Sequence, residues 1–323
     1  MSTIKDVANL AGVSVATVSR VLNKNGYVHE DTLKKVERAI EKLNYKPSTV
    51  ARSLYNKKSR LIGLVVPNIV NPFFPEVARA VEDVAYKQGY TVVLCNSDEC
   101  LDKEKQYIDA LMQNNVDGFI VATDQQNSSN YMNLQVPIVA IDRVFNERIP
   151  TVYADNYKGS KQATELLVRK GSKYIAHIRG PRNISTANER FEGFIEVVTN
   201  EQIPYIIAES AFDPIESESV TKELLEAHPY IDGIVAGNDL IALGVVKAAM
   251  QKGMCIPNDL QVIGFDGISL TEMMHPSITT VAQPIYEIGE VATQLLIQKM
   301  EGQAFEEKHY RLPVEIIERN TTK

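Results

Sequence analysis

Polar and aromatic side chains repeatedly follow short, β-branched apolar runs in the larger, C-terminal part of this chain. A sugar presents hydroxyl groups on its rim and C–H groups on its faces, so a pocket for it needs aromatic planes together with Asp, Asn, Gln and Arg groups. In a two-lobed sheet protein such residues belong on the loops beyond the carboxyl ends of the strands. The residues that meet both conditions are Asn71, Phe73, Phe74, Asp142, Arg143, Asn238, Asp266 and Gln283. The sequence therefore predicts a sugar-binding pocket built from distant loops.

Each of these side chains also has an ordinary structural explanation. Phe73 and Phe74 can be core residues, and the pair Asp142-Arg143 can be a surface ion pair of little energetic value. Asn238-Asp239 can cap the helix that follows. The recurrence of such residues at many strand ends favours the pocket.

Catalysis is the principal alternative, because α/β folds of this kind often carry enzymes. Asp142, Arg143 and Asp266 could in principle do acid–base work. However, the sequence contains no G-x-S-x-G elbow, no G-x-G-x-x-G motif and no P-loop, and its histidines show no metal-ligand spacing. The cysteines are odd in number, match no metal site and are interpreted as reduced thiols; they are Cys95, Cys100 and Cys255. We therefore predict a protein that is not an enzyme and has no metal or cofactor.

The apolar runs also predict the architecture of this part. From Leu61 onward they alternate with helical stretches, as expected for parallel strands that are covered on both faces. The predicted strands are 61–66, 90–95, 118–122, 138–141, 174–178, 205–208, 233–236 and 262–265. The echo of 117–121 by 232–235 indicates two similarly wound halves. A helix over 284–300 and a strand over about 312–317 are expected to cross back between them.

The first 60 residues differ from the rest in charge and in pattern. They hold 12 Lys and Arg against 5 Asp and Glu, a net charge of +7, whereas the remaining residues hold 22 against 36, a net charge of −14. A basic head on an acidic body predicts a local surface that binds phosphates. Apolar periodicity predicts three helices, which begin near Thr3, Ser14 and Glu30, and the third is expected to end near Asn44.

The second of these helices follows a tight turn at Gly12-Val13, which is typical of a helix that reads the major groove of DNA. Val15, Ala16 and Arg20 are expected on its outward face, where the arginine can bond guanine and the apolar pair can meet thymine methyl groups. The nearby hydroxyl groups suit phosphate contacts, and they belong to Ser14, Thr17 and Ser19. A plain three-helix bundle with a solvated arginine is the alternative.

The head resembles that of the lactose-repressor family over Thr3–Ala8, Gly12–Asn23, Leu43–Pro47 and Ala51–Leu54. This resemblance implies that residues 48–56 form a hinge helix, which is too short to be stable alone and forms when two chains pair over DNA. It implies further DNA contacts at Thr3, Asn23, Ser48, Ala51, Arg52 and Leu54. Leu54 would wedge into the minor groove, and an ordinary linker side chain is its alternative.

The larger part resembles periplasmic ribose-binding protein. The resemblance adds Arg190 and Phe212 to the pocket. It implies that Phe73, Phe74 and Phe212 flank a sugar ring, that the polar residues bond its hydroxyl groups, and that the sugar is ribose. Another pentose, a hexose or a nucleoside-type ligand is the alternative.

Together the two resemblances imply an all-α helix-turn-helix head and a two-lobed α/β sensor like a periplasmic binding protein, with doubly wound parallel sheets. The expected domains are the head at 1–47, the hinge helix and linker at 48–60, and the sensor at 61–323. Its N-subdomain is expected at about 61–157 and 287–311, and its C-subdomain at about 158–286 and 312–323.

The implied function is that of a homodimeric repressor of a sugar-utilisation operon. It would bind a near-palindromic operator in double-stranded DNA and leave it when the sugar binds, with corepression as the alternative. The basic head and the lack of a leader argue against a transport protein, and the lack of a long apolar run argues against membrane contact. We therefore expect a cytoplasmic protein.

Overall fold

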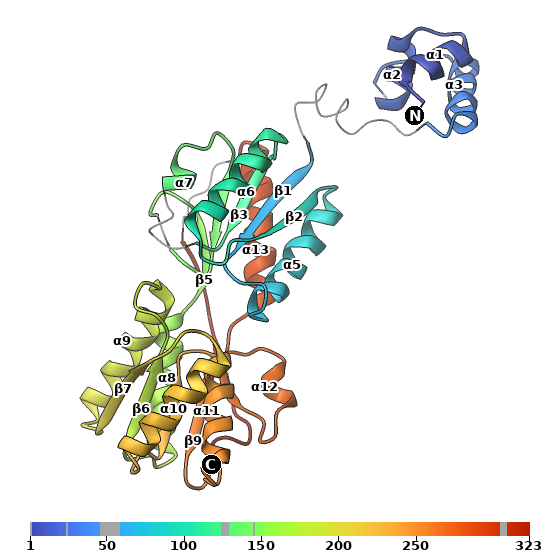
Figure 1. Ribbon diagram of the computed structural model, residues 1–323. Helices are drawn as coiled ribbons and strands as arrows, with labels where there is room; N and C mark the ends of the chain where they lie inside the picture. Colours follow the sequence, from blue (N-terminus) through green and yellow to red (C-terminus); the bar gives the residue numbers. More distant parts are fainter. Residues whose placement is uncertain (1, 24, 46–58, 124–128, 145, 304–308) are drawn as a thin grey trace. The chain divides into compact units, whose positions relative to one another are not determined.

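The computed structural model describes residues 2–23, 25–45, 59–123, 129–144, 146–303 and 309–323. The chain divides into two compact units, Met1–Arg60 and Leu61–Lys323 (Figure 1). We call them the head unit and the large unit and describe each by itself.

Three helices form the described part of the head unit: α1 (Ile4–Ala11), α2 (Val15–Asn23) and α3 (Glu30–Lys42). Thr3 begins α1 with a capping box, since its hydroxyl accepts the Asp6 amide and its own amide donates to the Asp6 carboxylate. Gly12 ends α1 with φ 68°, a left-handed conformation that glycine adopts without strain. Ser14 caps α2, because its Oγ accepts the Thr17 amide at 3.1 Å. The three predicted helices are confirmed.

These helices enclose a small apolar core, which explains why apolar residues recur at helical spacing in this part of the sequence. The core residues are Val7, Ala8, Ala11, Val18, Val36 and Ala39. The third helix ends at Lys42 rather than near the expected Asn44.

Two six-stranded sheets form the middle layers of the described large unit. Sheet A has the order β11-β5-β4-β3-β1-β2, and sheet B has the order β12-β10-β9-β8-β6-β7. The strands of sheet A are β1 (Leu61–Val66), β2 (Thr91–Asn96), β3 (Gly118–Val121), β4 (Ile138–Ile141), β5 (Thr151–Ala154) and β11 (His309–Leu312). The strands of sheet B are β6 (Ile175–Arg179), β7 (Tyr205–Glu209), β8 (Gly233–Ala236), β9 (Gln261–Asp266), β10 (Thr279–Ala282) and β12 (Glu315–Ile317). The described pairs are parallel except β10 with β12, so the expectation of two similarly wound halves is confirmed.

Helices cover both faces of each sheet and complete two lobes (Figure 1). Lobe A is sheet A with α5 (Phe73–Lys87), α6 (Leu101–Gln113), α7 (Ser129–Met132) and α13 (Ile285–Met300). Lobe B is sheet B with α8 (Asn156–Arg169), α9 (Ser185–Asn200), α10 (Pro214–Ala227), α11 (Asp239–Gln251) and α12 (Leu270–Met273). In β1, Ile62 and Leu64 pack in the core shared with α5 and α13, whereas Val65 packs in the core shared with α6. This double burial explains the continuous apolar run of the strand.

The chain passes between the two lobes at three described segments, residues 154–156, 282–285 and 312–315, which we call the first, second and third crossings. The third crossing corrects a prediction. The expected single strand over 312–317 is wrong, because β11 ends at Leu312 in sheet A and β12 begins at Glu315 in sheet B. Pro313 lies between them and has no amide to donate to either sheet.

Candidate functional site

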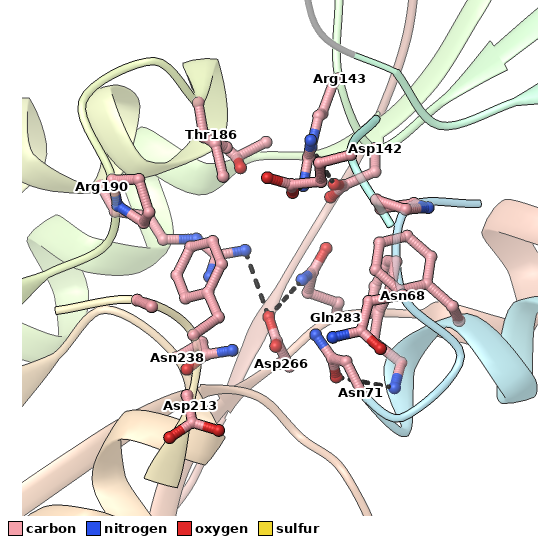
Figure 2. A pocket seen from close by; sticks show the side chains of 18 of the residues that line it. Asn68, Asn71, Asp142, Arg143, Thr186, Arg190, Asp213, Asn238, Asp266 and Gln283 are labelled. Carbon is pink, nitrogen blue, oxygen red and sulfur yellow. Dashed lines mark hydrogen bonds and ion pairs between the residues drawn. The ribbon is translucent and has the colours of Figure 1, made fainter. Parts of the chain in front are cut away.

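A cavity of about 320 Å³ lies between the two lobes of the large unit. Residues from both lobes and from the second crossing form its wall, and their polar groups point into it (Figure 2). The wall residues are Pro67, Asn68, Asn71, Phe73, Phe74, Asp98, Glu99, Asp142, Arg143, Pro181, Ile184, Thr186, Arg190, Ala211, Phe212, Asp213, Asn238, Asp266 and Gln283. Most of them follow the carboxyl end of a strand, which is where α/β folds place ligand sites.

The structure brings all ten predicted pocket residues onto this one wall. Sequence reasoning missed the other nine wall residues. Asn68 follows β1 and Asp98-Glu99 follows β2, so the same strand-end rule could have found them. Ala211 and Asp213 flank Phe212, which the resemblance had already singled out.

Arg190 is the most highly connected cation of the wall. It comes from α9, is 4% exposed, and its guanidinium stacks over the Phe265 ring at 3.8 Å. Its Nη2 lies 3.2 Å from Asp266 Oδ1, its Nη1 donates to the Gly237 carbonyl at 2.7 Å, and its Nε donates to Asn156 Oδ1 at 2.9 Å. These contacts hold the guanidinium in place at the cavity wall.

Asp266 ends β9 beneath this arginine. Its Oδ1 also accepts a hydrogen bond from Gln283 Nε2 at 2.7 Å, so the two side chains share one carboxylate oxygen (Figure 2). Burial raises the pKa of Asp266 to about 6, and the charge of Asp142 acts in the same direction, while Arg190 opposes the rise. The carboxyl group therefore lies close to its titration range near neutral pH.

Asp239 is buried behind the wall and holds the turn that carries Asp266. Its Oδ2 accepts the amides of Gly267 and Ile268 at 2.7 and 2.9 Å, and its Oδ1 accepts the Thr280 hydroxyl. Asp266 has φ 117°, a conformation that a non-glycine residue keeps only when its surroundings hold it. Burial raises the pKa of Asp239, and the negative charge of Asp266 adds to this rise.

Asp142 and Arg143 form a second ion pair, on the lobe A side of the cavity. Arg143 Nε lies 3.4 Å from Asp142 Oδ2, and Arg143 Nη2 lies 3.3 Å from Glu99 Oε1. Both side chains of the Asp142-Arg143 pair are at most 10% exposed, so the alternative of a surface ion pair is wrong. Burial raises the pKa of Asp142, although Arg143 opposes the rise.

Aromatic rings complete the wall. Phe73 and Phe74 belong to the core of lobe A and also line the cavity, with their rings edge to face at 5.1 Å. Phe212 comes from lobe B and lies directly over Gly180, where a Cβ atom would fall 2.4 Å from its ring. Asn71 Oδ1 accepts the Phe73 amide at 3.1 Å, and Asn238 Oδ1 caps α11 by accepting the Ile241 amide at 3.0 Å. Both the core and the capping alternatives therefore hold alongside a place on the wall.

Acidic groups outnumber basic groups on this wall. The two cations, Arg143 and Arg190, are already paired with carboxylates. Further carboxylates are less deeply buried, and we call them the acidic rim: Asp98, Glu99 and Asp213. Such a cavity suits a neutral polyhydroxyl ligand better than an anion.

The head unit presents a second candidate surface on α2. Val15 is 41% exposed, and Ala16 and Arg20 are exposed as well, as expected for the outward face. Thr17 and Ser19 are half-buried on the same helix. The hydroxyl groups of Thr3, Ser14 and Thr17 form cap contacts. The side chain of Asn23 and the whole of Ser48, Ala51, Arg52 and Leu54 lie outside the described residues.

Neither a metal site nor a membrane-spanning helix finds support in the described part of the chain. No group of three or more His, Cys, Asp and Glu side chains there could hold a metal ion. No helix among these residues is both long enough and apolar enough to cross a membrane.

Comparison with known proteins decides the family. Residues 59–320 match the family described as periplasmic binding proteins and sugar binding domain of LacI family, and residues 3–48 match the bacterial regulatory proteins of the lacI family. The chain belongs to the LacI family. It is a DNA-binding regulator with a helix-turn-helix head, and not an enzyme.

Similar proteins cover most or all of this LacI-family chain. A ribose operon repressor of Halalkalibacterium halodurans is 52% identical over 323 residues, which cover 100% of this chain and 98% of the relative. A LacI family transcriptional regulator from Enterococcus faecium, solved with bound ribose, is 31% identical with a TM-score of 0.74, covering 81% of this chain and 98% of that one. The Lac repressor dimer bound to operator and the anti-inducer ONPF is 28% identical with a TM-score of 0.89, covering 99% and 98%. The predicted family and fold are therefore confirmed.

Proposed function

We propose that this chain is a sequence-specific transcriptional repressor of a ribose-utilisation operon, released from its operator when ribose binds between the lobes. The observation that carries the proposal is the convergence of ten predicted residues, from both lobes and the second crossing, on one polar cavity. The similarity to a ribose operon repressor and to a regulator with bound ribose supports this choice of sugar.

The cavity offers the two kinds of contact that a sugar needs. Phe73, Phe74 and Phe212 supply apolar surfaces for the faces of the ring. The groups that would bond hydroxyls are the side chains of Asn71, Asp142, Arg143, Arg190, Asn238, Asp266 and Gln283. The volume of about 320 Å³ lies at the lower end of the usual range for small-molecule sites, which favours a monosaccharide.

The switch would act through the arrangement of the lobes. A sugar bonded from both lobes favours one arrangement over the other, and it can shift the equilibrium only by the difference in its affinity for the two. In a homodimer, two α2 helices would meet successive half-sites of a near-palindrome, and the segment 48–60 would pair over its centre. The shift would separate these segments and release the operator. Since the target is chromosomal DNA, we place the protein in the cytoplasm.

Calorimetric titration of the full chain with ribose tests the identity of the ligand. Separate titrations with xylose, arabinose, glucose and adenosine test the alternative ligands. We expect ribose to bind one site per chain and more tightly than the others. A gel shift then tests the response, on a duplex selected from a random DNA pool with the same protein. Ribose should weaken the complex with DNA, and tighter DNA binding would make the sugar a corepressor. If another compound binds more tightly than ribose in the titrations, that compound becomes the proposed ligand.

A further inference from the structure

Asn156 lies on the first crossing and joins the cavity to the backbone that connects the lobes. It is the first residue of α8, is 1% exposed, and is not part of the cavity wall. Its Oδ1 accepts from Arg190 Nε at 2.9 Å, while its Nδ2 donates to the carbonyl of Ala154 at 3.1 Å. Ala154 is the last residue of β5 in lobe A, and Arg190 belongs to lobe B. The amide therefore bridges the wall arginine and the crossing segment.

The second crossing is also linked to the carboxylate that Arg190 contacts, Asp266. Gln283 lies between β10 and α13, and its Nε2 donates to Asp266 Oδ1. Arg190 Nη2 contacts this same oxygen at 3.2 Å (Figure 2). Two crossings are thus tied to a single carboxylate oxygen, the first through Asn156 and Arg190 and the second through Gln283.

We propose that Asn156 is a positioning residue that transmits occupancy of the cavity to the first crossing. This inference rests on the proposed function, in which a sugar hydroxyl bonds Asp266. Arg190 and Gln283 share Oδ1 of this carboxylate, and a hydroxyl that donates to the same carboxylate draws negative charge away from that oxygen and weakens both contacts. Arg190 Nη1 stays bonded to the Gly237 carbonyl at 2.7 Å. A shift of its Nη2 end therefore turns the guanidinium about this bond and changes the hydrogen bond between Nε and Asn156.

The chemistry of the amide explains why this position requires asparagine. One end must accept from a guanidinium while the other donates to a backbone carbonyl. An aspartate would keep the acceptor but place a second carboxylate oxygen against the Ala154 carbonyl, and an alanine would keep neither bond. Neither change alters a residue of the cavity wall, although the aspartate adds a negative charge beside Arg190.

The test measures two quantities for the full chain: the Kd for ribose by calorimetry, and the ratio of DNA affinities without and with saturating ribose. The DNA is the duplex selected from a random pool with the wild-type protein. For Asn156→Ala we expect a ribose Kd within about threefold of wild type and a DNA response reduced about fivefold or more, toward a ratio of 1. The matched control is Asn188→Ala, since Asn188 lies on α9 and bonds a different arginine, Arg179. It should respond as the wild type does.

A normal DNA response in folded Asn156→Ala overturns the inference. So does a variant that loses ribose affinity about thirtyfold but responds fully once saturated, because Asn156 would then only support Arg190 for binding. If the alanine variant fails to unfold cooperatively, Asn156→Asp takes its place, and a normal response there overturns the inference equally. Failure of the wild type to bind ribose overturns the proposed function itself, which separates the two outcomes.

Discussion

The affinity for ribose should fall as the pH is lowered from 7.5 to 5, because ionised Asp266 accepts sugar hydroxyls more strongly than the protonated form does. Burial and the charge of Asp142 raise the pKa of Asp266 to about 6. In the free protein this carboxylate therefore takes up a proton at a higher pH than an ordinary aspartate does. Hydroxyl donors favour the ionised form, and binding therefore releases a proton. With a pKa of about 6 the ionised fraction falls to about one-tenth at pH 5, which weakens binding by at most about tenfold relative to pH 7.5.

Calorimetry at pH 5, 6 and 7.5, in two buffers of different ionisation enthalpy, measures both the Kd and the number of protons released. The matched variant is Asp266→Asn, which has no titratable group at this position. It should bind about thirtyfold more weakly at pH 7.5, from the loss of about 2 kcal/mol of charge-assisted hydrogen bonding, and its Kd should depend much less on pH. A wild-type Kd that stays constant over this range, or an undiminished pH dependence in Asp266→Asn, would refute the assignment.

Further predictions concern the aromatic wall, the acidic rim and the head. Gly180→Ala should weaken ribose binding about tenfold or more, because the new Cβ displaces Phe212; calorimetry checks this, and an unchanged Kd would remove that ring from the site. Ribose 5-phosphate should bind at least about a hundredfold more weakly than ribose, since both wall arginines are already paired beside the acidic rim; competition calorimetry decides, and equal affinity would contradict the charge argument. Arg20→Ala should cost about 1–3 kcal/mol of discrimination between DNA sequences and leave ribose binding unchanged; gel shifts on the selected and a scrambled duplex measure it, and intact preference would exclude α2 as the reading helix.

The sequence predicted those parts of the fold that are governed by local pattern. β1 and β4 are continuous apolar runs with the predicted bounds, because both faces of each strand are buried. β5 and β10 were not predicted as strands. Each has only four residues and includes threonine, and their burial depends on neighbours that are distant in the sequence. The division of residues 309–317 into β11 and β12 was missed for the same reason, since assignment of these strands to different sheets is a tertiary property.

The site was predictable to the extent that strand ends mark it. Asp142 follows β4 directly and Asp266 is the last residue of β9, whereas Arg190 comes from a helix and entered through the resemblance alone. Asn156 gave no signal of its own, and Asp239 was noted only beside Asn238 after a strand, because the importance of both lies in which atoms they meet. Nothing in the sequence indicates the role of Gly180 either, although the Phe212 ring packs directly against it.

The bonding of the wall explains how one cavity can serve as a switch rather than only as a binding site. Arg190 already satisfies three acceptors, and Asp266 already accepts from two donors. A sugar that bonds these groups alters contacts that already exist, whereas Gln283 Oε1 and Arg143 Nε are buried without a hydrogen-bond partner among the described residues and can gain one. Apolar contact with the phenylalanine rings adds to the affinity. Arg190, Asp266 and Gln283 also link the first and second crossings, so we expect a ligand that bonds them to change the relative stability of the lobe arrangements.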